Sequence, residues 1–363
     1  IGLDAAGNPL PNAQSGVAIA AASTGVLVGG GSVPNTIAGN ANYGVYIADA
    51  GTSANTVQGN LIGGSGGRGN VLAGVTLRNG AHDNLVDANT IVGQAAAPGV
   101  EIAGASTRLN SVRGNRIGID ATEAVVANQV GVRLGEGAHD NAIGSGGRNT
   151  ISGNTGAGVL LSGAGSFNTV EGNYIGLTGG GSGDRGNGGD GVRIEAGSSN
   201  TAIRDNTIAG NVGAGIQVRD AATVETTIVR NRIGINAAAS FVVPNDGDGI
   251  LVGADAQRSN IGLADSPANA NLIRGNGGAG IRVVSGQDHR IRVNSIGSNS
   301  GLGVDLGATG VTANDAVDAD TGANALQNFP LLSNVLRNAG MVSMTVAMDS
   351  TPNTDFTANV YRN

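Results

Sequence analysis

A four-residue pattern recurs through most of this 363-residue chain: Gly, an aliphatic residue, any residue and a second aliphatic residue. Typical copies are Gly44-Val45-Tyr46-Ile47 and Gly191-Val192-Arg193-Ile194. The copies begin at Gly16, Gly44, Gly74, Gly99, Gly131, Gly158, Gly191, Gly215, Gly249, Gly280 and Gly303. Their spacing of about 23 to 34 residues is typical of solenoid repeats. Such units are expected to stack on one another rather than to surround one central core.

Each repeat also contains a second pattern, Asn-x-aliphatic-x-Gly-Asn, often followed by x-Ile, as in Asn55 to Ile62 and Asn110 to Ile117. Alternating inward and outward residues predict short β-strands, about three in each repeat. Gly and Asn tolerate the left-handed backbone of sharp corners, whereas each Gly inside a helix would cost about 1 kcal/mol. The sequence therefore predicts about 11 stacked parallel rungs, forming a rod about 50 Å long.

The core of such a rod has to be thin, because the chain has 65 Gly, no Trp and only 2% aromatic residues. Its hydrophobic residues are 40% of the chain and are mostly Ala, Val, Ile and Leu. This composition favours an elongated body over a sphere. The chain also has no Cys, which excludes disulfide bonds and thiol catalysis.

Asn residues at equivalent corners are expected to stack in one column, with each side-chain amide bonding to the next. The column is predicted to contain Asn40, Asn60, Asn115, Asn154, Asn173, Asn231 and Asn276. Such a ladder explains the abundance of Asn in structural terms and needs no ligand.

A longer period of about 58 residues is superimposed on the repeat. It relates Ile117-Gly118-Ile119-Asp120, Ile175-Gly176-Leu177-Thr178 and Ile233-Gly234-Ile235-Asn236, with Ile1-Gly2-Leu3-Asp4 in phase. Alternate rungs should therefore carry a longer loop, and these loops should leave from one edge. The edge is either a binding side or, in the preferred interpretation, a corner under little constraint. Because Ile1 lies within a repeat, we expect a mature fragment or part of a longer protein.

On these motifs, residues 1 to about 306 resemble bacterial right-handed parallel β-helix repeat proteins. These are large exported proteins, often found with CSLREA-type regions, and they share the pectate-lyase-like fold. The resemblance implies an all-β, right-handed, single-stranded parallel β-helix in an extracellular or cell-surface location. It says little about activity, because the same scaffold carries lyases, hydrolases, epimerases and adhesins.

After the β-helix we predict an Asp-rich exit loop or cap over 307–340 and the start of a β-sandwich-like segment over 341–363. Asp315, Asp318, Asp320 and Asn324 offer closely spaced oxygen ligands around a Gly. This pattern suits Ca²⁺ and partly matches the spacing of an EF-hand, although the terminal Glu is missing. A solvated, turn-rich loop is the alternative, and no other cofactor is expected.

Candidate catalytic residues are sparse. A pectin-type hydrolase would present paired Asp residues on the outer face of a mid-helix strand, with Gly-His-Gly and Arg-Ile-Lys nearby, and the predicted strands carry none of these. Glu101, Arg133 and Arg193 are the remaining weak candidates, and Glu101 with Arg133 is more simply a cross-rung charge pair. His82-Asp83 and His139-Asp140 share a corner two rungs apart. Neighbours in a turn are expected to point apart, so these pairs are not favoured as general bases, and His289 is weaker still.

The net charge of −7 and the scattered Arg residues argue against nucleic-acid binding. No apolar run reaches the length of a membrane span. We therefore favour a non-enzymatic extracellular protein, such as a surface stalk, adhesin or matrix component. A polysaccharide lyase, hydrolase or epimerase on the same scaffold is the alternative. Expected partners are polysaccharide or cell-surface components, and unpaired end rungs would also permit homotypic end-to-end assembly.

Overall fold

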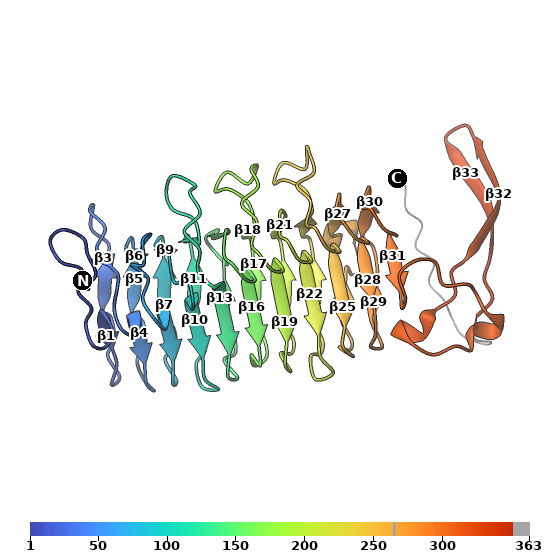
Figure 1. The fold of residues 1–363 in the computed structure, drawn as a ribbon. Coiled ribbons are helices and arrows are strands. Elements are labelled where there is room, and N and C mark those ends of the chain that lie inside the picture. The colour runs from blue at the N-terminus through green and yellow to red at the C-terminus, as the bar shows by residue number, and fades with distance from the viewer. Residues whose placement is uncertain (264–265, 351–363) are drawn as a thin grey trace.

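The computed structural model describes residues 1–263 and 266–350, in which three parallel sheets run along a rod (Figure 1). The first sheet has 11 strands, and the second and third have 10 strands each. Each rung contributes one strand to each sheet in turn, so neighbours in a sheet come from successive repeats. The predicted all-β parallel solenoid is confirmed.

The Gly-aliphatic tetrads form the first sheet, as one continuous stripe. Its strands are β1 (Val17–Ile19), β4 (Tyr43–Ala48), β7 (Ala73–Arg78), β10 (Pro98–Ala103), β13 (Val130–Gly135), β16 (Val159–Ser162), β19 (Val192–Glu195), β22 (Ile216–Arg219), β25 (Ile250–Gly253), β28 (Ile281–Val283) and β31 (Val304–Leu306).

The second pattern supplies the other two sheets. The second sheet consists of β2 (Leu27–Gly29), β5 (Thr56–Gln58), β8 (Leu85–Asp87), β11 (Ser111–Arg113), β14 (Ala142–Ile143), β17 (Thr169–Glu171), β20 (Ala202–Arg204), β23 (Thr227–Val229), β26 (Asn260–Ile261) and β29 (Arg290–Ile291). The third consists of β3 (Thr36–Ile37), β6 (Leu61–Gly63), β9 (Thr90–Val92), β12 (Arg116–Ile117), β15 (Thr150–Ile151), β18 (Tyr174–Ile175), β21 (Thr207–Ile208), β24 (Arg232–Ile233), β27 (Leu272–Arg274) and β30 (Ser295–Gly297).

Stacked aliphatic side chains fill the interior. In the third sheet, Ile91, Ile117 and Ile151 are register partners and all three are fully buried. Burying one such side chain contributes roughly 1.5–3 kcal/mol. The interior is therefore one continuous, thin core, to which each rung adds its own side chains.

The tetrad glycines have a packing role that differs from the corner role predicted for Gly. A Cβ atom at Gly131 would lie 2.4 Å from the carbonyl oxygen of Gly158 and 2.4 Å from Cγ2 of Ile151. The backbone of Gly131 is not left-handed, so the glycine is required by close approach alone. Gly118, with φ of 90°, has the predicted corner role.

The prediction of a single Asn column is wrong, because the structure contains three columns. Asn40, Asn154 and Asn276 belong to the column between the third sheet and the next rung, and the other predicted members lie between the second and third sheets. The column between the second and third sheets consists of Asn35, Asn60, Asn89, Asn115, Asn149, Asn173, Asn206, Asn231, Asn271 and Asn294. The column between the third sheet and the next rung has Gln94 at one position and consists of Asn12, Asn40, Asn70, Gln94, Asn128, Asn154, Asn187, Asn211, Asn245, Asn276 and Asn299. A third column precedes the second sheet and contains Asn55, Asn84, Asn110, Asn141 and Asn168.

Long loops leave from one edge, as predicted, and they occur on alternate rungs from β12 to β24. Four of these loops follow a third-sheet position, and each is closed by an isolated antiparallel bridge. We call them the loop row: residues 3–9, 119–125, 177–184 and 235–242. Three of these loops rise from the same side of the rod in Figure 1. Glu123 accepts a 3.0 Å bond from the amide of Gly179, and the amide of Ala237 donates to Gly181 at 2.9 Å. Successive loops of the row therefore support one another.

The C-terminal region contains short 3₁₀ turns and one hairpin. After η1 (Pro267–Asn269) within the rod, η2 (Ala316–Asp318) and η3 (Ala323–Leu326) follow β31. The antiparallel strands β32 (Leu331–Asn338) and β33 (Met341–Ala347) then extend beyond the end of the rod (Figure 1). The predicted boundary at 340 falls in the turn of this hairpin. The part of the predicted β-sandwich-like segment after residue 350 lies outside the described residues.

Candidate functional site

The catalytic candidates of the outer face fall into two separate ion pairs. Glu101 and Arg133 are register partners on β10 and β13, and Nη1 of Arg133 donates to Oε1 of Glu101 at 2.8 Å. The hydroxyl of Thr76 on β7 donates to Oε2 of Glu101 at 3.3 Å. Arg193 lies two rungs beyond Arg133, where it pairs with the buried Asp190 at 2.7 Å. The structure therefore brings Glu101 and Arg133 together and leaves Arg193 apart from them.

Within each His-Asp pair the two side chains contact each other, contrary to the prediction. Nδ1 of His82 lies 2.7 Å from Oδ2 of Asp83, and the same atoms of His139 and Asp140 are 2.6 Å apart. Both Asp residues have φ of 54°, and this left-handed turn brings each carboxylate back to the preceding ring. Arg108 occupies the intervening rung, so the two pairs are separated from each other.

In the acidic segment, three of the four predicted Ca²⁺ ligands lie close together. Oxygen atoms of Asp315, Asp318 and Asp320 lie within 4.8 Å of one another. Oδ1 of Asp315 and Oδ1 of Asp320 are buried and have no hydrogen-bond partner. Partial burial and the charges of Asp315 and Asp318 raise the pKa of Asp320 above its ordinary value. These carboxylates repel one another, and a cation would relieve both the repulsion and the unpaired oxygens.

Chain segments distant in sequence hold this cluster in place. The hydroxyl of Ser350 donates to Oδ2 of Asp318 at 2.7 Å, and the amide of Asn328 donates to Oδ1 at 2.8 Å. Asp349 is adjacent, since its Oδ1 accepts a 3.2 Å bond from the amide of Val317. The sequence reasoning missed Asn328, Asp349 and Ser350, because no local pattern relates them to the Asp-rich segment.

Asn324, the fourth predicted ligand, has a different contact. Its Oδ1 accepts from the amide of His289 at 2.8 Å, and its Nδ2 donates to the carbonyl of His289 at 3.1 Å. His289 precedes β29, the last strand of the second sheet. Asn324 thus fastens η3 to the end of the rod, and its amide oxygen is occupied there.

A family description, right handed beta helix region, matches residues 99–328. This chain belongs to the right-handed β-helix family. The matched part of the β-helix extends past β31 and includes Asp315, Asp318 and Asp320 as well as Glu101 and Arg133. No curated protein matches the chain.

Several solved structures are similar to this β-helix. The Dettilon tailspike protein has 14% identity and a TM-score of 0.48, and the match covers 72% of this chain and 46% of the tailspike. PfbA, a surface adhesin of Streptococcus pneumoniae, has 11% identity and a TM-score of 0.42, covering 85% of this chain and 71% of PfbA. The A-module of the Azotobacter vinelandii mannuronan C-5 epimerase AlgE4 has 14% identity and a TM-score of 0.32, covering 74% and 80%. Among residues 1–263 and 266–350, no helix has the length and apolar character needed to cross a membrane.

Proposed function

We propose that this β-helix is a non-enzymatic extracellular protein, a surface stalk, adhesin or matrix component, with polysaccharide or other cell-surface components as partners. The main support is that the side chains which sugar chemistry would need are bonded to one another along the rod. Both oxygens of Glu101 are engaged, and Arg193 is held by Asp190. Such pairs contribute up to about 1 kcal/mol each to the stability of the rod.

The test is incubation of the whole chain with a panel of acidic polysaccharides, with and without Ca²⁺. We expect no new chain ends, no unsaturated products and no change in sugar configuration. The variant Arg133→Ala should behave identically in this assay and should unfold at slightly lower urea concentration. Turnover by the original chain that is lost in Arg133→Ala would replace this proposal with a polysaccharide-processing enzyme.

At the C-terminal end of the rod, η3 covers the end of the second sheet in the described residues. Ala323 in η3 is buried, and Asn324 is bonded to His289 beside β29. We propose that this cover prevents end-to-end assembly through the second sheet at this end. Sedimentation at several concentrations tests this part, with no growth into filaments expected as the concentration rises.

We also propose that Asp315, Asp318 and Asp320 hold Ca²⁺. Hard oxygen ligands suit this ion, and the two buried oxygens without partners fit a cation better than they fit a solvated loop. A bound ion would strengthen the link between the segment before η3 and the segment after the hairpin, because Asp318 already contacts Ser350. The role is structural, since the cluster lies beyond the last strand of the rod.

Calorimetric titration with calcium chloride tests the site. One binding event is expected for the original chain, and it should be absent in Asp320→Asn. The control is Asp255→Asn, which changes an exposed turn residue whose left-handed backbone Asn tolerates. Absence of heat from the original chain, or equal heat from Asp320→Asn, excludes the calcium site.

A further inference from the structure

The loop row is interrupted at one place. Alternate rungs carry long loops after β12, β18 and β24, but the rung of β6 carries a shorter, Gly-rich connection over 64–69. The stretch from Asn60 to Asn70 is three residues shorter than the equivalent stretch from Asn115 to Asn128. The hairpin that would cover the outer face of β6 is therefore missing, although the period of the sequence calls for one.

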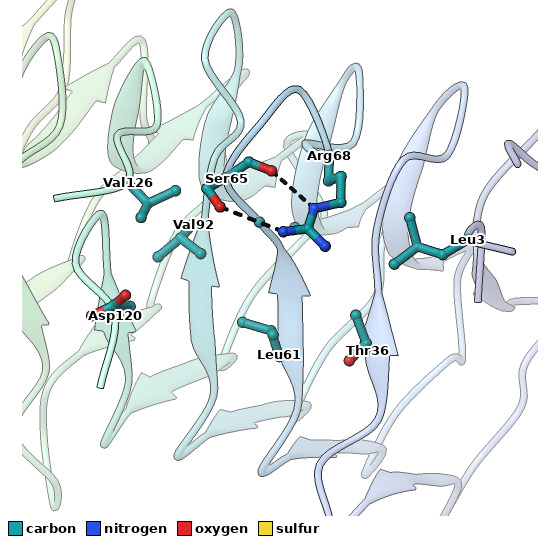
Figure 2. A pocket seen from close by; sticks show the side chains of 10 residues that line it. Leu3, Thr36, Leu61, Ser65, Arg68, Val92, Asp120 and Val126 are labelled. Atoms are coloured by element: carbon teal, nitrogen blue, oxygen red, sulfur yellow. Dashed lines mark hydrogen bonds between the residues drawn. The ribbon is translucent and has the colours of Figure 1, made fainter. Parts of the chain in front are cut away.

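A trough of about 160 Å³ occupies this gap. Figure 2 shows Thr36 and Leu61 on the strands beneath it, Leu3 at one end, and Asp120 and Val126 at the other. Most of the surface that lines the trough is apolar. The volume is well below the roughly 300–1,000 Å³ of pockets for drug-sized ligands, so the trough accommodates only a small group.

Arg68 supplies one cation at this trough. Its Nε donates to the carbonyl of Ser65 at 2.9 Å, and Nη2 lies 3.5 Å from the Ser65 hydroxyl (Figure 2). A Cβ atom at Gly7 would be 3.6 Å from Nη1, so the guanidinium reaches the 3–9 loop. No carboxylate of the described residues forms an ion pair with Arg68, whereas Arg116 on β12 pairs with Glu123 of the loop row at 2.6 Å.

Asp120, at the far end of the trough, does not act as the anionic partner of Arg68. Oδ1 of Asp120 accepts bonds from the hydroxyl and amide of Thr122 at 2.7 and 2.8 Å and from the amide of Ala124 at 3.0 Å. The hydroxyl bond of Thr122 is the main reason that the pKa of Asp120 is lowered. This charge is stabilised within its own loop, so the guanidinium of Arg68 remains available to an incoming anion.

We propose that the trough binds a small aliphatic carboxylate, with its carboxylate on Arg68 and its hydrocarbon body against Leu3, Leu61 and Val92. A guanidinium recognises a carboxylate through charge-assisted hydrogen bonds, and the aliphatic lining favours a branched apolar body over a polyhydroxylated one. The same chemistry is offered by a free short-chain acid and by the C-terminal residue of a peptide. The site does not depend on the proposed scaffold function.

Saturation-transfer NMR and calorimetry on the whole chain test the site with three probes. 4-Methylpentanoate represents the free acid, N-acetyl-leucine represents a peptide C-terminus, and N-acetyl-leucinamide is the uncharged counterpart. Saturable binding is expected for one or both acids, and the stronger of them identifies the source. The amide should bind at least about tenfold more weakly, since it cannot form the charge-assisted bond.

Two variants separate a built site from general attraction to Arg. Arg68→Met keeps the aliphatic stem, and binding of the acids should fall at least about tenfold. Arg108→Met is the matched control, because Arg108 also donates to a nearby carbonyl, that of Ser106 at 3.2 Å, but lies at another corner. Leu61→Asp should suppress binding without loss of the folded rod, as checked by thermal unfolding. The proposal is overturned if neither acid saturates, if acid and amide bind equally, if glucuronate binds better than both acids, or if Arg68→Met binds as the original chain does.

Discussion

Each corner Asn joins three successive rungs. The Nδ2 of Asn115 donates to Oδ1 of Asn149 at 3.0 Å and to carbonyls of its own and the preceding rung, including that of Val86 at 2.9 Å. Its Oδ1 accepts from the amide and the side chain of Asn89 at 2.9 and 3.1 Å. The side chain is almost fully buried. Its polar atoms are therefore used completely, and none is free for a ligand.

The variant Asn115→Ala should lower the free energy of unfolding by about 3 kcal/mol or more, because it leaves several buried donors and acceptors without partners. Urea unfolding followed by circular dichroism measures the loss. Arg232→Ala, which removes an exposed side chain from β24, should change stability by less than about 0.5 kcal/mol. Equal effects of the two variants would contradict the structural role assigned to the column.

His289 takes the place of an Asn in the column before the second sheet. Its Nδ1 accepts from the amide of Ser259 at 3.2 Å, as Oδ1 of Asn110 accepts from the amide of Asn84 at 3.1 Å. This contact requires a neutral ring, and burial lowers the pKa of His289 below its ordinary value. Because the folded state binds the proton less tightly than the unfolded chain, stability is complete above the unfolded pKa and is lost as pH falls below it.

The melting temperature should therefore fall between about pH 7.5 and pH 5, the range in which an unfolded His takes up its proton. His289→Asn offers the same acceptor without a titrating ring, so its melting temperature should vary less over this range. Scanning calorimetry of both proteins at the two pH values measures the difference. Identical pH dependence would show that other groups determine the loss in acid.

At the scale of the strand, Gly131 shows how closely two rungs approach. Gly131→Ala should destabilise the chain by roughly 1–3 kcal/mol through overpacking against Gly158 and Ile151. Gly297→Ala is the matched control, because a Cβ atom there has no neighbour within 4 Å and the backbone is not left-handed. It should be neutral or slightly stabilising. A similar small effect at both positions would mean that the rungs can separate at no cost.

The strands could be predicted because their determinants are local and periodic. Val100 and Ile102 alternate with Glu101, and the same alternation returns in each repeat, which fixes the stripe of the first sheet. The Asn columns could not be separated, because Asn115 and Asn154 occur in similar local patterns yet lie at different corners. The contact of His82 with Asp83 depends on a left-handed turn at Asp83, which its residue type permits but does not require.

The candidate sites were less predictable than the fold. The cluster of Asp315, Asp318 and Asp320 follows from their proximity in sequence, but Ser350 and Asp349 join it only through the path of the hairpin. The trough beside Arg68 arises from a loop that is shorter than its equivalents. Its walls come from residues far apart in sequence, such as Leu3 and Val126. Neither feature has a local signature.

For the whole molecule, a rod in which each rung contacts mainly its neighbours is sensitive to what happens at its ends. η3 covers the end of the second sheet through Asn324, so Asn324→Ala should loosen β29 and leave the middle of the rod unchanged. Hydrogen exchange should become faster at Arg290 and Ile291 and stay the same at β10 and β13. Asn314→Ala is the matched control, since Asn314 makes the same pair of bonds with the backbone of Phe329, within the C-terminal region itself. Faster exchange along the whole rod in Asn324→Ala would instead mean that the rod unfolds as one cooperative unit, with the contact to η3 contributing to its global stability.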